Sequence, residues 1–206
     1  VAAARARGIM VTNTPGVLDD STADLAWTLI LATARRLTEV EANIRNGEWT
    51  GWRLKQWLGV DVHHATLGII GMGRIGQVIA KRAGGFDMRV IYHNRTRLDA
   101  AIEQRLNATY VTQDELLAQS DFIVLQMPYS KETHHLIGAK ELAKMKPTAI
   151  LINSTRGGVV DDGALVEALK NGTIRAAGLD VFENEPALNP GFLELKNVVL
   201  TPHIGS

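Results

Sequence analysis

Short apolar runs alternate with longer mixed segments along most of this chain of 206 residues. Runs of three to five mostly branched apolar residues, bounded by polar or glycine-containing segments, are typical of buried parallel strands. Their regular alternation with helical patterns predicts an α/β fold with a doubly wound parallel sheet of the Rossmann type. We expect strands at 66–70, 89–93, 109–111, 121–125, 149–152, 176–179 and 198–200, and helices at 1–6, 19–46, 77–82, 114–119, 140–146 and 161–171.

Two of these helices carry recognisable start signals. Residues 19–46 have apolar positions at roughly helical spacing, which predicts one long helix, and Asp or Ser at its start is a favoured N-cap. Asp161 and Asp162 open the helix at 161–171, and we expect them to cap it and not to act as a catalytic carboxylate pair. The N-cap candidates of the long helix are Asp19, Asp20 and Ser21.

A glycine motif lies between the expected strand at 66–70 and the helix that follows it. Gly71-Met72-Gly73-Arg74-Ile75-Gly76 has the G-x-G-x-x-G spacing, and its place between a strand and a helix makes it far more specific than the spacing alone. Gly71 permits a tight turn, Gly73 allows the backbone to approach a pyrophosphate, and Gly76 allows the helix to pack on the strand. The free amides at the helix start, near Arg74 and Ile75, then face the phosphates. The alternative is a glycine-rich turn with no ligand.

The residues after the next strand bear on the choice of cofactor. An NAD enzyme usually places Asp or Glu here to accept from the ribose 2′-hydroxyl, whereas this chain has Asn94-Arg95-Thr96-Arg97. A carboxylate would repel a 2′-phosphate, and an arginine can bind one in a fork. The turn therefore favours NADP over NAD. The alternative is a solvated basic turn.

Three candidate catalytic residues follow three apolar runs in the last third of the chain. Arg156, Glu185 and His203 follow the expected strands at 149–152, 176–179 and 198–200. Ligands of open α/β sheets bind beyond the carboxyl ends of the strands, so we expect these side chains to meet in one crevice. The set suits the reduction of a 2-keto acid, because arginine can grip a carboxylate and a protonated histidine can give a proton to a carbonyl oxygen. Glutamate beside the imidazole favours its charged form.

These motifs together resemble the D-isomer-specific 2-hydroxyacid dehydrogenase family, and within it the glyoxylate/hydroxypyruvate reductases and the 2-ketogluconate reductases. The resemblance covers nearly the whole chain, and the combination of Arg, Glu and His is specific to the family. It implies an oxidoreductase that uses NADP(H), with NAD less favoured, to reduce glyoxylate, hydroxypyruvate or 2-ketogluconate to the D-2-hydroxy acid. The stretches that carry the resemblance are 13–16, 47–52, 71–76, 94–97, 133–136, 153–158, 178–186 and 202–206.

The resemblance also implies roles for individual residues. Arg156 binds the substrate, His203 is the acid and base, Glu185 pairs with His203, and Asp180 holds the nicotinamide carboxamide. Asp87 departs from the family pattern, because glycine is common at this position, and we expect a strained turn there. The cofactor site implied as a whole comprises Gly71, Gly73, Arg74, Ile75, Gly76, Asn94, Arg95, Thr96, Arg97, Pro128, Thr133, Thr155, Arg156, Asp180, His203 and Gly205.

Composition excludes several other classes of function. Lysine plus arginine and aspartate plus glutamate number 22 each, so no basic field invites nucleic acid. The chain has no cysteine and no apolar run long enough to span a bilayer, and we expect a cytoplasmic protein without disulfides. We expect no metal at the histidine pairs 63–64 and 134–135, because adjacent histidines point apart and no carboxylate cluster accompanies them.

The family resemblance predicts how the chain is organised. Residues 1–18 are expected to be a remnant of a substrate domain, including a strand at 9–13, and residues 19–206 the dinucleotide-binding domain. We expect a homodimer through the long helix and the segment after it, in which tryptophans 49, 52 and 57 lie. Two other functions stay open: an NAD(H)-sensing corepressor of the same fold, which would have an acidic residue at Asn94, and a relative that uses phosphoglycerate or formate. Gln126 and Met127 leave the preferred keto acid open.

Overall fold

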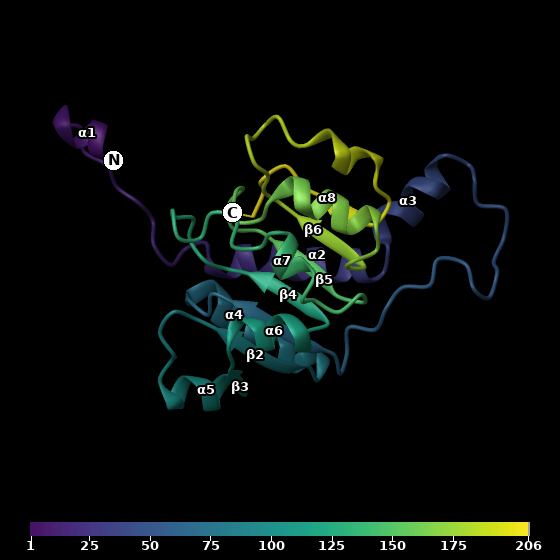
Figure 1. The fold of residues 1–206 in the computed structure, drawn as a ribbon, viewed down its shortest axis with the longest axis horizontal. Coiled ribbons are helices and arrows are strands. Elements are labelled where there is room, and N and C mark those ends of the chain that lie inside the picture. The colour runs from purple at the N-terminus through teal and green to yellow at the C-terminus, as the bar shows by residue number, and fades with distance from the viewer. Residues whose placement is uncertain (206) are drawn as a thin grey trace.

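The computed structural model describes residues 1–205 and contains a single parallel sheet of seven strands (Figure 1). The strand order is β3-β2-β1-β4-β5-β6-β7, and every neighbouring pair is parallel. The order reverses between β1 and β4, which is the switch point of a doubly wound sheet. This confirms the expected fold class. The strands are β1 (Thr66–Ile70), β2 (Arg89–His93), β3 (Ala108–Tyr110), β4 (Phe122–Leu125), β5 (Ile150–Asn153), β6 (Ala176–Leu179) and β7 (Val198–Leu200).

Helices cover both faces of this sheet. Helices α2 and α4 pack together on one face, where α2 contacts β5, β6 and β7 and α4 contacts β1 and β2. Helix α6 packs against β1 and β2 from the other face, on the side of α7 and α8. None of the helices within residues 1–205 is long and apolar enough to cross a membrane. The helices are α1 (Ala2–Ala6), α2 (Asp19–Ala34), α3 (Leu37–Arg45), α4 (Arg74–Ala83), α5 (Ala100–Leu106), α6 (Gln113–Gln119), α7 (Ala139–Leu142) and α8 (Asp162–Lys170), with 3₁₀ turns η1 (Gly84–Phe86) and η2 (Pro190–Glu194).

The sheet separates two apolar cores. In β2, the buried side chains of Val90 and Tyr92 belong to the core under α2 and α4, whereas Ile91 belongs to the core under α6, α7 and α8. Successive side chains of a strand point to opposite faces, so the central positions of a strand covered on both faces are apolar in succession. This is why the strands could be recognised as unbroken apolar runs.

The helix expected at 19–46 is wrong as a single element. Helix α2 ends at Ala34 and α3 begins at Leu37, because Arg36 between them takes a left-handed conformation with φ of 56°. The Arg36 guanidinium donates to both carboxylate oxygens of Glu39, at 2.7 and 2.8 Å, in the first turn of α3. This pairing between Arg36 and the first turn of α3 stabilises the break between the two helices. The spacing of apolar residues does not reveal such a break.

The caps of the helices are partly as expected. Leu18 is the N-cap of α2 and no side chain caps it; Ser21 instead donates its hydroxyl to the Leu18 carbonyl, so the three proposed caps of this helix were wrong. In contrast, Asp161 Oδ1 accepts from the Ala164 amide at 2.9 Å, which confirms a cap at the start of α8. Asp87 has φ of 51°, which confirms that its turn requires a conformation favourable to glycine.

The first eighteen residues lie largely outside the sheet and its two cores. Figure 1 shows α1 well away from the body of the molecule, joined to α2 by an irregular segment. The strand expected at 9–13 does not form, because no strand of the described chain pairs with it; Ile9 and Met10 are 57% and 87% exposed. An apolar pattern predicts a strand only where a neighbouring strand is present to satisfy its backbone groups.

Candidate functional site

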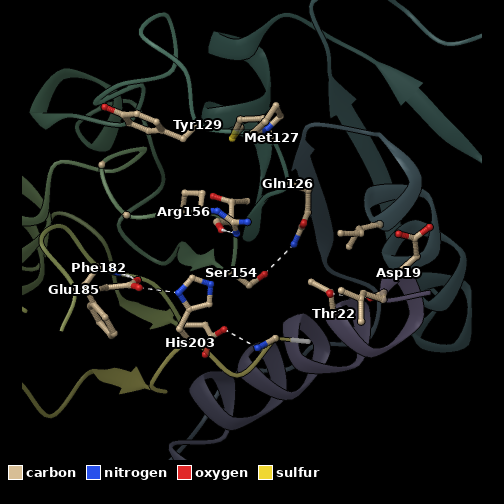
Figure 2. Close-up of a pocket in the computed structure, with 18 of the residues that line it drawn as sticks. Asp19, Thr22, Gln126, Met127, Tyr129, Ser154, Arg156, Phe182, Glu185 and His203 are labelled. Carbon is tan, nitrogen blue, oxygen red and sulfur yellow. Dashed lines mark hydrogen bonds and ion pairs between the residues drawn. The ribbon is translucent and has the colours of Figure 1, made fainter. Parts of the chain in front are cut away.

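A cleft of about 1200 Å³ lies at the carboxyl ends of the central strands (Figure 2). It is bounded by the start of α2, the start of α4, and the loops that follow β4, β5, β6 and β7. This is the position where open α/β sheets bind ligands. The predicted site residues that line it are Arg74, Ile75, Pro128, Thr155, Arg156, Asp180, Glu185, His203 and Gly205.

The glycine motif forms the turn between β1 and α4, and each glycine meets a different requirement. Gly71 has φ of 103°, and a Cβ there would clash with the backbone of Gln126. A Cβ on Gly76 would lie 2.5 Å from the Gly71 carbonyl oxygen, so this position needs glycine for close packing within the turn. Gly73 has ordinary φ, and the space around its missing Cβ contains no atom within 4 Å. The open space beside Gly73 leaves room for a ligand against the backbone.

The start of α4 fits the phosphates of a dinucleotide. Gly73 is its N-cap and no side chain of the described residues caps it, so the first amides of the helix have no side-chain acceptor. Unpaired amides and the helix dipole together favour an anion at this end. The Arg74 side chain turns to α2, where its Nε donates to Asp19 Oδ2 at 3.0 Å.

The turn after β2 joins the glycine motif through one hydrogen bond. Asn94 Oδ1 accepts from the Met72 amide at 2.6 Å, and Arg95 and Thr96 follow with exposed side chains. Arg97 is different, because its guanidinium forms a two-point ion pair with Glu103, with both donor–acceptor distances at 2.8 Å. The structure therefore gives Arg97 a protein partner where the sequence predicts a cofactor phosphate.

The segment after β5 presents Arg156 to the cleft. Buried Asn153 accepts from both the amide and the hydroxyl of Thr155, and its own amide nitrogen donates to the Arg156 carbonyl. The Thr155 side chain, predicted to bind cofactor, thus helps to shape this turn. A Cβ on Gly157 would clash with the carbonyl of Phe182, so the Arg156 turn packs directly on the loop after β6. Arg156 itself is exposed to the cleft.

Glu185 and His203 form a hydrogen-bonded pair. Glu185 Oε2 lies 2.7 Å from His203 Nδ1, and Glu185 Oε1 accepts from the Phe182 amide at 2.9 Å. Burial alone would raise the pKa of Glu185, but the hydrogen bonds from His203 and Phe182 hold it below its ordinary value. Glu185 is therefore ionised at neutral pH and can stabilise a protonated imidazole. When Nδ1 faces Glu185, Nε2 is the ring nitrogen that remains for other chemistry. Figure 2 shows this pair and Arg156 around the same cleft.

Asp180 holds the loop that carries His203. The residue is 1% exposed, and its carboxylate accepts three hydrogen bonds, from the Thr201 hydroxyl at 2.6 Å and from the amides of Ile204 and Gly205 at 2.9 Å each. Three bonds to its own chain make Asp180 a support for the segment after β7. Ser206, the last residue of this motif, lies outside the described residues.

The wall after β4 contains further predicted residues. Thr133 Oγ1 donates to the Pro128 carbonyl and accepts from the Ser130 amide, so it stabilises the turn after Pro128. Gln126 Nε2 donates to Ser154 Oγ at 2.8 Å, which ties the ends of β4 and β5 together. Thr22 and Tyr129 also line the cleft, and they come from segments in which the sequence shows no motif. Four further lining residues lie in stretches that carry the family resemblance, but the sequence indicates no role of their own for them: Asn13, Ser154, Phe182 and Asn184.

Sequence reasoning also missed a hydrogen-bonded pair beside the cleft. His135 Nε2 lies 2.6 Å from Glu183 Oε1, and the rings of His134 and His135 stack with centroids 3.9 Å apart. The reason given against a metal here was wrong, since Glu183 does accompany the pair, with ligand atoms within 4.8 Å of one another. Asp162 accepts from the Glu183 amide, and burial raises the pKa of Asp162 to about 6.

Comparisons with known proteins agree with this geometry. A profile described as "D-isomer specific 2-hydroxyacid dehydrogenase, NAD binding domain" matches residues 27–205, and the chain belongs to this family. The matched region is the NAD-binding domain of this family. It is 58% identical over 204 residues to the glyoxylate reductase of Thermococcus litoralis, which is 97% of this chain and 61% of that protein.

Two further relatives give the same result. Glyoxylate/hydroxypyruvate reductase B of Erwinia tasmaniensis is 51% identical over 208 residues, which cover 100% of this chain and 64% of that protein. The crystal structure of a glyoxylate reductase from Paecilomyes thermophila superposes with a TM-score of 0.89 at 45% identity, over 99% of this chain and 61% of that one. The chain therefore spans about three fifths of the length of these relatives.

Proposed function

We propose that this chain serves in the NADP(H)-dependent reduction of a small 2-keto acid to the D-2-hydroxy acid. The observation that carries the proposal is the Glu185–His203 pair, with a separation of 2.7 Å, in the cleft that Arg156 and the start of α4 also line. An imidazole held by a carboxylate beside an exposed guanidinium is suited to protonating a carbonyl oxygen whose neighbouring carboxylate is bound.

The residues of the cleft fit a nicotinamide dinucleotide. The start of α4 and the open space at Gly73 suit the pyrophosphate, and Asp180 and His203 line the same cleft as Arg74 and Ile75 of α4. When bound, NADPH supplies the hydride, while the protein supplies orientation and charge. Asp180 is proposed to hold the carboxamide in addition to its loop contacts, because Oδ2 accepts only one hydrogen bond within the described residues.

The turn after β2 supports NADP over NAD. No acidic side chain stands at position 94, and Asn94 uses its carbonyl oxygen to accept from Met72. The exposed Arg95 guanidinium and Thr96 hydroxyl are positioned on this turn to bind a 2′-phosphate, which a carboxylate would repel. The same neutral residue argues against an NAD(H)-sensing corepressor.

The catalytic groups divide the chemistry between them. Arg156 binds the substrate carboxylate, because a guanidinium can donate two parallel hydrogen bonds to it. His203 in its charged form gives the proton on Nε2 to the developing alkoxide, and Glu185 stabilises that charged form across the 2.7 Å contact. In the oxidative direction, neutral His203 takes the proton back.

The family relatives support the choice of substrate class. The names of the relatives from Thermococcus litoralis and Erwinia tasmaniensis make glyoxylate and hydroxypyruvate the first candidates, and 2-ketogluconate remains a third. Phosphoglycerate and formate are the alternatives. The test measures NADPH oxidation with each of these keto acids, using the natural polypeptide in which these 206 residues occur. Turnover with glyoxylate or hydroxypyruvate is expected, and turnover with none of the keto acids would contradict the proposal.

We also propose a homodimer and two parts to the chain. Figure 1 shows α3 and the segment after it reaching away from the sheet, with apolar side chains exposed to 80% at Trp52 and 75% at Leu54. A second copy of the chain would cover this surface.

Residues 1–18 are proposed as part of a substrate domain and 19–206 as the cofactor domain, since α1 and the segment after it contribute nothing to either apolar core. The cytoplasmic location stays a prediction.

A further inference from the structure

We infer that Arg97 does not bind the cofactor phosphate but holds the shape of the turn that does, through Glu103 and Tyr92. The inference rests on the proposed NADPH preference and assigns positioning residues to it. The turn in question runs from Asn94 to Leu98, between β2 and α5, and Arg95 and Thr96 lie in its middle.

The Arg97 guanidinium is already engaged by a carboxylate. Its Nε donates to Glu103 Oε1 and its Nη2 donates to Glu103 Oε2, both at 2.8 Å, in the planar two-point geometry that arginine prefers. Glu103 has only 11% of its side chain exposed. The hydrogen bond from Arg97, with a second from Tyr92, lowers the pKa of Glu103 to about 2. Glu103 is thus a permanent anion that needs a cation beside it.

Tyr92 connects this ion pair to the end of the turn. Its fully buried hydroxyl donates to Glu103 Oε1 at 2.7 Å and accepts from the Leu98 amide at 2.9 Å. Burial and the neighbouring Glu103 raise the pKa of Tyr92 to about 12, so the hydroxyl keeps its proton and both hydrogen bonds keep their direction. The carboxyl-terminal end of the turn is therefore fixed from the core.

The other end of the turn is fixed from the glycine motif. Asn94 Oδ1 accepts from the Met72 amide at 2.6 Å, and the Tyr110 hydroxyl donates to the Asn94 carbonyl at 3.3 Å. Between the two fixed ends, Arg95 and Thr96 have exposed side chains with no side-chain hydrogen bond inside the described part of the protein. A turn that is ordered before binding loses less conformational entropy when a phosphate docks on its central residues.

Direct binding by Arg97 is the alternative, and charge argues against it. To reach a phosphate, Arg97 would have to leave Glu103, and a mostly buried carboxylate would lose its cation. If Arg97 stays on Glu103, their charges cancel. The turn then offers one cation at its centre, Arg95, which forms no ion pair within the described residues and has the Glu132 carboxylate as a nearby charge.

The test compares NADPH and NADH binding by fluorescence titration to the natural polypeptide that contains this chain. The variants are Glu103→Gln and Tyr92→Phe, with Arg95→Ala as the control for direct phosphate binding. Arg95→Ala should weaken NADPH binding by more than about tenfold and leave NADH nearly unchanged. Glu103→Gln and Tyr92→Phe should each weaken NADPH binding by roughly three- to tenfold, with a smaller effect on NADH, because both release the turn.

The two possible roles of Arg97, positioning the turn or binding the phosphate, predict opposite changes in NADPH affinity for Glu103→Gln. If Arg97 bound the phosphate itself, removing the competing carboxylate would strengthen NADPH binding, and Tyr92→Phe would leave it unchanged. Either of these results in a variant with an unaltered circular dichroism spectrum would overturn the inference. Tyr92→Phe removes a single oxygen, so it also keeps the test open if Glu103→Gln does not fold. Failure of the proposed cofactor preference can be distinguished from these results, because the protein without substitutions would then bind NADH as tightly as NADPH.

Discussion

The Glu185 carboxylate lies 2.7 Å from His203 Nδ1, although the two residues come from loops that follow different strands, β6 and β7. Each side chain is held by a separate support. Glu185 accepts from the Phe182 amide, and Asp180 accepts from the amides next to His203. Hydrogen bonds within the chain therefore hold both members of the pair in place.

Glu185→Gln should change the pH dependence of keto-acid reduction. The Glu185 carboxylate stabilises the charged form of His203, which reduction requires. The same contact holds the pKa of Glu185 below its ordinary value, so replacing the carboxylate by an amide removes this stabilisation and the alkaline limb of the rate profile should move to lower pH. The measurement is the rate of NADPH oxidation against pH for both proteins. An unchanged profile would exclude the pairing as a source of catalytic charge.

The three glycines of the motif should respond differently to alanine. Gly73→Ala meets no atom within 4 Å, so its melting temperature should stay within about 2 °C of the parent while NADPH binding weakens. Gly71→Ala and Gly76→Ala both meet the backbone, and Gly71 also has φ of 103°, so these should be destabilised. Thermal melts and NADPH titrations check both halves. A Gly73→Ala protein with full NADPH affinity would show that the cofactor does not approach this position.

Asp162→Asn should stabilise the protein at neutral pH. Burial raises the pKa of Asp162 to about 6, so the folded state binds a proton more readily than the unfolded chain does. The stability associated with that proton is full below the ordinary pKa of an aspartate and is lost as pH rises through about 6. Asparagine keeps an acceptor for the Glu183 amide without the buried charge. Once solvent screening is allowed for, the free energy of unfolding should rise by about 1 kcal/mol at pH 7.5.

The proposed dimer can be tested by placing charge on the extended segment after α3. Trp52→Glu and Leu54→Glu introduce carboxylates on side chains that are 80% and 75% exposed, so folding of a single chain should be unaffected. Sedimentation should show a dimer for the parent and a monomer for the double variant. Trp27→Glu is unsuitable as a control because Trp27 is buried; Leu193→Glu, at an exposed site on η2, should remain dimeric.

The predictable parts of the site are those that the local sequence pattern and the direction of the strands determine. The apolar runs before Arg156 and His203 both end at the carboxyl edge of the sheet. Parallel strands therefore predict that the two side chains share one crevice. The pairing of Arg97 with Glu103 was not predictable, because both residues are charged, lie near a helix start, and could equally have faced solvent.

Two other features depended on the tertiary structure. The break between α2 and α3 depends on the left-handed Arg36, at a position where the apolar spacing continues unchanged. Glu183 reaches His135 only because the loops after β4 and β6 are neighbours in the folded chain, and nothing in the sequence near either residue indicates the partner.

The most direct test of the proposed function is the effect of His203→Gln on keto-acid reduction by the natural polypeptide that contains this chain. Rates of NADPH oxidation are measured with glyoxylate or hydroxypyruvate, beside NADPH titrations of the same proteins. If His203 supplies the proton, its loss should lower kcat by roughly 10²–10⁴-fold while NADPH affinity stays nearly unchanged. A His203→Gln protein that reduces either keto acid at close to the parent rate would contradict the assignment of this cleft as the catalytic site.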